Sequence, residues 1–457
     1  MSNNMENNID LVSAPKKSFW KLSIPIICFL IFNAAYSLVD MFWVSKISGD
    51  AFFAIGASMP IFVLICSIGD SIGQGTNSIM SRSIGFKHYE TSYNALIHGI
   101  ISCIIISLFI ACLINYLDEL LRLILITEHA NLVKIYLIPI CLSSLIFIFS
   151  NFFCETFQVE GNSKTPTLVI IFSNILNLAL DPLFIFTFKL GISGAAYATI
   201  VSSLTSVIIF FFFYLSKRTK VPLSLKYFKF RLIIFFEIFK VAVPNFLIDS
   251  LWCISALFIN SILVRQVGPV GIVLYSASNK VLELLVSPVR GFGRGLMSVS
   301  GHLFGAKKFD ELKEMYLYVL KISVISSFII SIAFLLLSNL IFKSFFAINM
   351  ETSVMWISIF GVVVLVAIQF SSISAKMLDG FGKSYFSLLF LILKMGLQAG
   401  SMLALEKIFD FGGCVLIGIT LTEIVFSAVY FIFLNYLFKK FKNKEDYVVL
   451  REWVVNI

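Results

Sequence analysis

Residues 24–44 read IPIICFLIFNAAYSLVDMFWV, and this stretch decides the fold. It belongs to an almost wholly apolar run from Phe19 to Val44, long enough to cross the roughly 30 Å hydrocarbon core of a bilayer as a helix. The exception is Asp40. Because an acid at the centre of a membrane helix costs about 2.5–3.5 kcal/mol on insertion scales, Asp40 needs a functional or structural reason to be there.

The composition of the whole chain indicates a membrane protein. Hydrophobic residues make up 59% of the 457 residues and charged residues 13%, whereas roughly 25% of a soluble domain is charged. The mean hydropathy is +0.95. A soluble fold cannot bury this much apolar surface, but lipid can solvate it. The sequence also lacks the basic face of a folded soluble domain that a nucleic-acid partner would require.

The N-terminal residues show no cleavable leader pattern, because 1–17 are polar and the apolar run that follows is too long for the core of a signal peptide. We therefore expect the first span to stay in the mature protein. The eight cysteines lie mostly inside apolar runs and form no CxxC pair. We interpret them as small buried hydrophobes, not as disulfides or metal ligands, and expect no cofactor.

Apolar windows of roughly 20 residues recur along the chain and predict an all-α polytopic membrane protein with twelve transmembrane helices in two pseudo-symmetric six-helix bundles. The expected spans are 18–44, 52–79, 94–115, 130–157, 166–188, 192–216, 237–263, 270–299, 314–341, 349–376, 384–406 and 412–438. The expected parts are a cytoplasmic N-terminal segment (1–17), an N lobe (18–216), a cytoplasmic connector (217–236), a C lobe (237–438) and a cytoplasmic tail (439–457).

Lys and Arg residues orient these spans. With both termini inside, the cytoplasmic side holds Lys16, Arg82, the connector and the tail, and the opposite loops hold far fewer basic residues. This positive-inside bias predicts a multi-pass protein of the cell (plasma or inner) membrane with both termini in the cytoplasm. The formal net charge of +9 is then mainly a signal of topology.

The two halves of the chain resemble each other. Pro244 in VAVPNFLI matches Pro25 in LSIPIICF, and in the same register LDGFGKS (378–384) matches VEGNSKT (159–165). Parallel six-span repeats imply a pseudo-two-fold axis along the membrane normal and suit a transporter in which two lobes rock against each other. This register also places Gly400 opposite Asp181, so the second half lacks the acid.

Four segments of the N-terminal half resemble a known family. The segments are YSLVDMFWVSKISG in span one, EGNSKTP (160–166) before span five, NLALDP within it and GISGAAYAT at the start of span six. This pattern is similar to that of the multidrug and toxic compound extrusion (MATE) transporters, in particular to their prokaryotic DinF-like branch. The resemblance implies twelve helices in two lobes and antiport of organic compounds against H⁺ or Na⁺, and it does not choose between the two ions.

Helix geometry brings several polar residues of the N lobe to one depth. At 1.5 Å per residue, Asp181 lies roughly 22 Å from the inner edge of span five and Thr199 roughly 13 Å from the outer edge of span six. Asn177 and Asp181 are four residues apart and share a helix face, as do Tyr36 and Asp40. Two acids close together in a low dielectric require a shared proton or a bound cation. A purely structural hydrogen-bonded pair is the alternative.

In the family pattern, Asp40, Asn177, Asp181 and Thr199 match the cation or proton site, which is also a possible Na⁺ site. Tyr36, Tyr136 and Asn151 match residues that shape the cavity of the N lobe. Pro25 permits span one to bend, and we predict that it serves as a hinge when ion binding changes the affinity for substrate. We expect small organic substrates of cationic or amphipathic character, contact with membrane lipid, no nucleic-acid partner and a monomer.

Two other functions are weighed against multidrug efflux. A flippase for lipid-linked oligosaccharides or lipids would need several basic residues in its cavity, and only Lys280 and Lys394 lie deep in the halves. A membrane enzyme is disfavoured because HExxH is absent and the four histidines are dispersed.

Arg290 and Arg294, near the cytoplasmic end of span eight, are expected to extend toward the membrane surface.

Overall fold

The structure is a computed structural model and describes residues 12–86, 88–119, 130–159, 161–216, 219, 221, 228–267, 269–346, 367–405 and 413–442. Within these ranges every regular element is a helix. Six of the described helices are long and apolar enough to span a membrane, and the bent pair α6 (Ala130–Leu142) and α7 (Ser144–Val159) forms a further candidate span. The prediction of an all-α membrane protein is confirmed.

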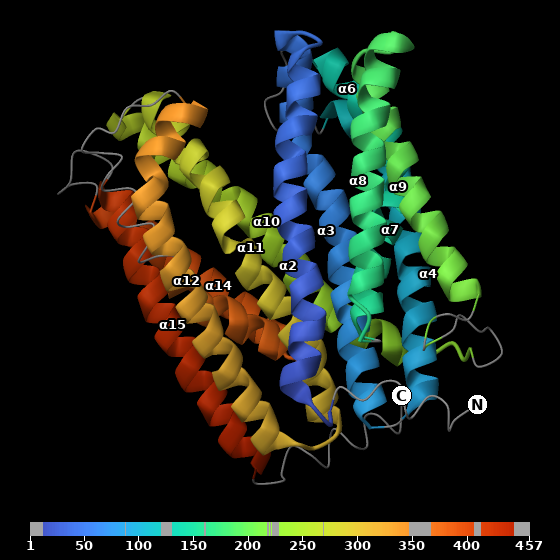
Figure 1. The fold of residues 1–457 in the computed structure, drawn as a ribbon, viewed down its shortest axis with the longest axis vertical. Helices are drawn as coiled ribbons and strands as arrows, with labels where there is room; N and C mark the ends of the chain where they lie inside the picture. Colours follow the sequence, from blue (N-terminus) through green and yellow to red (C-terminus); the bar gives the residue numbers. More distant parts are fainter. Residues whose placement is uncertain are drawn as a thin grey trace.

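The first bundle contains α2, α3, α4, the bent pair α6 and α7, α8 and α9 (Figure 1). The remaining bounds are α2 Pro15–Ser45, α3 Gly49–Gly85, α4 Tyr89–Leu113, α8 Lys164–Pro182 and α9 Ile192–Leu215. A short 3-10 turn, Ile114–Tyr116, follows α4. A π-helical turn, Leu183–Thr187, follows Pro182 at the end of α8. Pro182 therefore ends the regular helix directly after Asp181, because proline cannot donate the next helical hydrogen bond.

The second bundle contains α10, α11, α12, a helix over residues 367–380, α14 and α15. Their bounds are α10 Leu232–Val267, α11 Pro269–Gly305, α12 Phe309–Phe346, α14 Ser384–Leu405 and α15 Gly413–Lys442. The first part of the predicted span 349–376 lies outside the described residues. In Figure 1 this bundle, yellow to red, leans away from α2 at the top of the view and approaches it toward the bottom.

The first helix of each half packs into the core of the other half. Ile234 and Ile238 of α10 belong to the apolar core of the first bundle. Phe19 and Leu22 of α2 belong to the apolar core of the second bundle. This exchange ties the bundles together at the end where α3 and α11 finish.

Close backbone approach at that same end follows the predicted pseudo-symmetry. A Cβ on Gly85 would lie 2.5 Å from the carbonyl oxygen of His302, and a Cβ on Gly305 would lie 2.3 Å from that of Arg82. Gly85 and Gly305 occupy equivalent positions at the ends of α3 and α11. Only glycine permits helices to meet this closely, which explains why both repeats carry it there.

The register of the repeat differs from the predicted one in the later helices. Gly161 (φ 74°) and Gly382 (φ 71°) make the same turn before α8 and α14, so these two glycines are equivalent. Continuing this register along α8 and α14 pairs Asp181 with Met402. Placing Gly400 opposite Asp181 was therefore wrong.

A contact between neighbouring helices of each bundle supports this corrected register. Ser173 of α8 contacts Ser202 of α9 in the first bundle. The equivalent residues of the second bundle are Lys394 of α14 and Glu423 of α15, and these two also contact each other. The repeat thus preserves the packing of this helix pair while its side chains differ.

Candidate functional site

The residues that the sequence singled out in the first bundle form a hydrogen-bonded chain between α2 and α8. The Tyr36 hydroxyl donates to Asn177 Oδ1. Asn177 Nδ2 then donates to Asp181 Oδ1 at 3.2 Å. Asn177 and Asp181 are both 1% exposed. We refer to Tyr36, Asn177 and Asp181 as the acid chain, because each donor in it points toward the carboxylate.

A second contact one helical turn away fixes the register of these two helices. Asn174 Nδ2 of α8 donates to Asn33 Oδ1 of α2 at 3.1 Å. Asn33 and Tyr36 are three residues apart, as are Asn174 and Asn177, so both contacts lie on one face of each helix. The side chain of Asp40 lies outside the described residues, although its position follows Tyr36 by one turn of α2.

The following contacts of the other predicted site residues are not with the acid chain. Thr199 Oγ1 donates to the Ala195 carbonyl of its own helix at 3.0 Å. Asn151 Nδ2 likewise donates to the Phe147 carbonyl at 2.9 Å, and Tyr136 is buried in the apolar core of the first bundle. The roles of Thr199, Asn151 and Tyr136 in an ion site or cavity stay predictions.

Pro25 lies about a third of the way along α2. The proline has no N–H, so it leaves the carbonyl of Lys21 without its helical donor. Ser163 Oγ donates to that carbonyl at 3.1 Å. Ser163 belongs to the EGNSKTP segment, so two motifs that the sequence showed separately meet at the predicted hinge.

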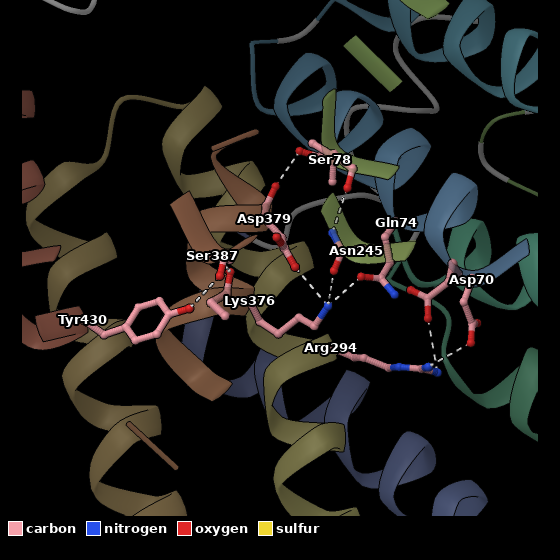
Figure 2. A network of polar contacts seen from close by, with 12 residues as sticks. Asp70, Gln74, Ser78, Asn245, Arg294, Lys376, Asp379, Ser387 and Tyr430 are labelled. Atoms are coloured by element: carbon pink, nitrogen blue, oxygen red, sulfur yellow. Dashed lines mark hydrogen bonds and ion pairs between the residues drawn. The ribbon is translucent and has the colours of Figure 1, made fainter. Parts of the chain in front are cut away.

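A second polar group, which the sequence did not predict, lies between the two bundles. Arg294 of α11 pairs with Glu155 of α7 at 3.2 Å and with Asp70 of α3 at 3.6 Å. Arg294 was expected to extend toward the membrane surface, and that expectation is wrong. The side chain points instead toward the first bundle, as Figure 2 shows for Arg294 and Asp70.

Lys376, on the helix 367–380, forms the other half of this group. Its Nζ donates to Gln74 Oε1 (2.6 Å), Asn245 Oδ1 (3.0 Å) and Asp379 Oδ2 (2.9 Å), which converge on it in Figure 2. The backbone carbonyl of Asp379 accepts a 2.7 Å hydrogen bond from Ser78 of α3. We call these residues, together with Arg294, Glu155 and Asp70, the central cluster.

Two ionisable residues of the central cluster, Glu155 and Lys376, were not singled out from the sequence. Glu155 is 1% exposed and lies in an apolar span, as Asp40 does. The rule that flagged Asp40, that an ionisable residue within a span has a purpose, would have found it. The same rule would have found Lys376, because this residue falls inside the predicted span 349–376.

Lys394 and Glu423 form an ion pair between α14 and α15. The side chains are 8% and 2% exposed, and Ser371 Oγ donates to Glu423 at 3.4 Å. Lys280 and Glu283 of α11 are three residues apart and are expected to pair with each other, but their side chains are not among those that the structure describes. Among the described side chains, no cluster of three His, Cys, Asp or Glu residues suited to a metal ion occurs.

Two interlocked helical bundles with a buried carboxylate chain in one of them define a two-lobed membrane transporter. The MatE family model matches residues 25–183 and 247–401, more than half of the chain. The chain therefore belongs to the MATE family of multidrug and toxic compound extrusion transporters, as its motifs predicted. Its place in the DinF-like branch stays a prediction.

The alignments with bacterial relatives span about two thirds of this chain and about two thirds of each relative. Multidrug export protein MepA of Staphylococcus haemolyticus is 23% identical over 313 residues, 68% of this chain and 69% of the relative. MepA of Staphylococcus aureus is 24% identical over 304 residues, which are 64% of this chain and 65% of the relative. Probable multidrug resistance protein YoeA of Bacillus subtilis is 28% identical over 323 residues, which are 66% of this chain and 68% of the relative.

Solved structures match almost the full fold. The outward-facing conformation of a multidrug resistance MATE family transporter superposes with a TM-score of 0.89 at 26% identity, covering 95% of this chain and 99% of that one. A transporter of the MOP superfamily from Pyrococcus furiosus, described as having a binding pocket of reverse polarity, gives a TM-score of 0.90 at 26% identity, with 95% and 98% covered. These matches confirm the twelve-helix, two-bundle fold.

Proposed function

We propose that this transporter exports small organic compounds, cationic or amphipathic in character, in exchange for H⁺ or Na⁺. The acid chain, completed by Asp40, is the ion site in this proposal. Exchange proceeds by alternating access, with the two bundles opening first to one side of the membrane and then to the other. The family and the relatives named for multidrug export or resistance support the substrate class.

The observation that carries this proposal is the buried hydrogen-bonded chain from Tyr36 through Asn177 to Asp181. A carboxylate that is 1% exposed inside a membrane span is costly unless it is neutralised by a proton or a cation. Only Asn177 donates directly to Asp181, and Tyr36 holds the Asn177 amide in the orientation that this contact requires. Asp40, one turn beyond Tyr36, is the second carboxylate of the proposed site.

Helix α2 provides the mechanical link from this site to the other bundle. Below Pro25, Phe19 and Leu22 are held in the core of the second bundle. Above Pro25, Tyr36 is bonded to α8 of the first bundle. A bend at Pro25 would move these two anchored parts relative to each other, so a change at the acid site reaches the interface between the bundles.

The packing of the bundles supports an outward-facing arrangement. The bundles meet where α3 and α11 end, and the positive-inside rule assigns those helix ends to the cytoplasm. Contact on the cytoplasmic side leaves the diverging ends directed outward. In this proposal the protein resides in the cell membrane with both termini inside.

Transport in proteoliposomes tests the proposal. Uptake of ethidium, an organic cation, is followed in vesicles with an imposed pH gradient and separately with an imposed Na⁺ gradient. We expect one gradient to drive uptake in the wild type, and Asp181→Asn or Asp40→Asn to remove the gradient-dependent part. Met402→Leu is the matched control, since it alters the equivalent position of the second bundle with little change in volume.

The outcomes separate coupling from folding. If Asp181→Asn and Asp40→Asn purify as folded monodisperse protein and still transport at the wild-type rate, the acids do not couple the ion.

The lipid-flippase alternative gains no support from Lys394, because that lysine is paired with Glu423.

A further inference from the structure

The connector between the two bundles ends in a non-helical segment that side chains of α4 hold. The backbone N–H of Lys229 donates to Asn94 Oδ1 at 2.8 Å, and the backbone N–H of Arg231 donates to His98 Nε2 at 3.0 Å. Asn94 and His98 are four residues apart and share one face of α4. We call these four residues the connector latch, because they join the segment before α10 to the first bundle.

The two contacts of the His98 ring define its protonation state. Nδ1 lies 2.7 Å from the backbone carbonyl oxygen of Asn94. A carbonyl oxygen can only accept, so Nδ1 carries a proton, and a backbone N–H can only donate, so Nε2 must be unprotonated. The connector latch therefore requires the neutral imidazole. A proton added to Nε2 would make it a donor that faces another donor, the N–H of Arg231.

The segment that His98 holds also covers the imidazole. The rings of Phe228, Phe230 and Phe235 lie with their centroids 5.4, 5.9 and 4.8 Å from that of the imidazole. The His98 side chain is completely buried. Two of these rings belong to the end of the connector and the third to the first turn of α10. Attachment of the segment and protonation of His98 therefore oppose each other.

Within the described part of the chain, no charged side chain forms an ion pair with His98. On the helices that pack against α4, the acidic and basic side chains nearest this end are Asp70, Arg82, Glu155, Glu237, Lys240 and Asp249. Asp70 and Glu155 pair with Arg294, and Glu237 pairs with Lys240. On α4 and the bound segment the corresponding side chains are His88, Glu90, Lys229 and Arg231. The two cations of the segment disfavour a further positive charge on His98.

The second bundle holds the start of α2 by the equivalent pair of positions. In the register set by the glycines at the ends of α3 and α11, Glu314 and Tyr318 of α12 correspond to the two latch residues of α4. Glu314 Oε1 accepts from Lys16 Nζ at 2.6 Å, and the Tyr318 hydroxyl accepts from Trp20 Nε1 at 3.0 Å. Each bundle thus fixes the start of the first helix of the other repeat.

The two sets of contacts differ in chemistry. Histidine is the side chain whose ordinary change of charge falls between pH 5 and 8. The α12 contacts use a tyrosine hydroxyl and a Lys–Glu ion pair instead. The repeat therefore preserves the geometry of attachment and gives a group that titrates near neutral pH to the connector alone.

We propose that His98 makes the attachment of the connector sensitive to protons. Neutral His98 holds the connector on α4, and protonation of His98 in an acidic cytoplasm releases it. Release frees the first turn of α10, the helix that links the two bundles, and so loosens one of the two attachments between them. The connector latch is separate from the acid chain, and it would act whichever ion drives export.

Hydrogen exchange of the full-length protein in detergent at pH 8 and pH 5 tests this inference. Protection factors are corrected for the chemical exchange rate at each pH and read from a peptide that includes Lys229 and Arg231. An imidazole that titrates near pH 6.5 once released weakens the attachment about 30-fold between these pH values. We expect protection to fall by about that factor at pH 5, and a change smaller than about twofold would overturn the proposal.

The α12 contacts provide the internal control. A peptide that includes Lys16 and Trp20 should keep its protection within about twofold in the same samples, because no histidine holds it. Tyr318→Phe removes the hydroxyl that accepts from Trp20 and should leave the pH response of the connector as it is in the wild type. A parallel fall of protection at both places would indicate general loosening in acid and would overturn the proposal.

Two variants of His98 test the role of the imidazole itself. His98→Gln places an amide oxygen as many bonds from Cα as Nε2, and this oxygen accepts without titrating. Protection of the connector should then be equal at pH 8 and pH 5. His98→Phe keeps a ring but has no acceptor, so protection should be low at both pH values. A 30-fold fall that persists in His98→Gln would overturn the proposal, and this test stands even if His98→Phe does not fold.

Asp181→Asn separates the connector latch from the proposed ion site. The connector of this variant should lose protection at pH 5 as in the wild type, because the latch does not include the acid chain. Loss of the pH response in Asp181→Asn would assign the effect to the ion site and overturn the inference. Failure of ion-driven transport in proteoliposomes would reject antiport and leave the connector latch intact.

Discussion

The two bundles share one backbone plan and bury their charges differently. The α8–α9 contact in the first bundle joins the Ser173 hydroxyl to the Ser202 carbonyl at 2.6 Å. At the equivalent place in the second bundle, Lys394 and Glu423 form a buried ion pair. Conversely, Asp181 of the first bundle is replaced by the fully buried Met402. The repeat thus conserves helix packing while leaving each bundle free to hold a different polar site.

This difference teaches how a symmetric scaffold carries an asymmetric function. The second bundle pairs its buried carboxylates Glu423 and Asp379 with lysines of its own, Lys394 and Lys376. The first bundle holds Asp181 through neutral donors, Asn177 and through it Tyr36. A carboxylate held by neutral donors still attracts a counter-ion, and this attraction is what an exchanger requires of an ion site.

The largest effect on stability is expected at the ion pair of the second bundle. Glu423→Gln leaves the Lys394 ammonium buried without its counter-charge and should destabilise the protein by about 3–5 kcal/mol. Ser173→Ala, at the equivalent contact of the first bundle, should cost about 1 kcal/mol because it removes one neutral hydrogen bond. Thermal unfolding in detergent measures both, and equal shifts would contradict the comparison.

The glycine contacts between the bundles should give the next largest effect. Gly305→Ala places a Cβ 2.3 Å from the Arg82 carbonyl oxygen, and Gly85→Ala makes the equivalent clash with His302. Each should cost about 1–3 kcal/mol through overpacking and should hold the bundles apart at this end. Gly400→Ala is the control, since among the described residues beyond its own helix backbone no heavy atom lies within 4 Å of the added carbon.

Cross-linking of cysteines placed at the ends of α3 and α11 reports the separation of the bundles. Lower cross-linking yield is expected in Gly85→Ala and Gly305→Ala and a normal yield in Gly400→Ala. Wild-type yields in both clash variants would show that the bundles do not meet as described.

A smaller effect is expected from Tyr36→Phe in the acid chain. The variant removes one hydrogen bond, worth about 0.5–1.5 kcal/mol, and leaves Asn177 Oδ1 without that donor. The loss corresponds to a few-fold weaker affinity for the coupling ion, measured as the ion concentration that gives half-maximal ethidium transport. An unchanged half-maximal ion concentration would show that Tyr36 does not contribute to ion binding.

The smallest effect is expected at Ser163, which caps the carbonyl that Pro25 leaves open. Ser163→Ala should cost about 0.5–1 kcal/mol, at the low end for a single hydrogen bond. The double variant Ser163→Ala with Pro25→Ala should recover this loss, because alanine at 25 restores the helical donor. Unfolding midpoints of the four proteins form the test, and additive losses would show that the two residues are not coupled.

Much of this architecture is predictable from apolar run lengths and charge placement. The segment from Phe19 to Val44 predicted α2, and the spacing of Asn177 and Asp181 predicted their contact, because helix geometry is local. The repeat predicted two related bundles. Its register was wrong near Asp181, since a short insertion between matching segments is invisible when the matches themselves are short.

Contacts between distant helices were not predictable. Arg294 sits in a sequence context typical of a surface-directed arginine, and only the approach of α11 to α3 and α7 brings it to Asp70 and Glu155. Lys394 and Glu423 likewise meet only because α14 packs against α15. The identity of a partner depends on tertiary packing, which residue spacing within one span does not encode.

Reciprocal binding of ion and substrate tests the central claim most directly. The dissociation constant of ethidium is measured in detergent across a range of pH and, separately, of Na⁺ concentration, for the wild type, Asp181→Asn and Met402→Leu. If the first bundle alone holds the coupling carboxylate, ethidium affinity depends on one of the two ions in the wild type and in Met402→Leu, and this dependence disappears in Asp181→Asn. An ion dependence that survives unchanged in Asp181→Asn would contradict the account.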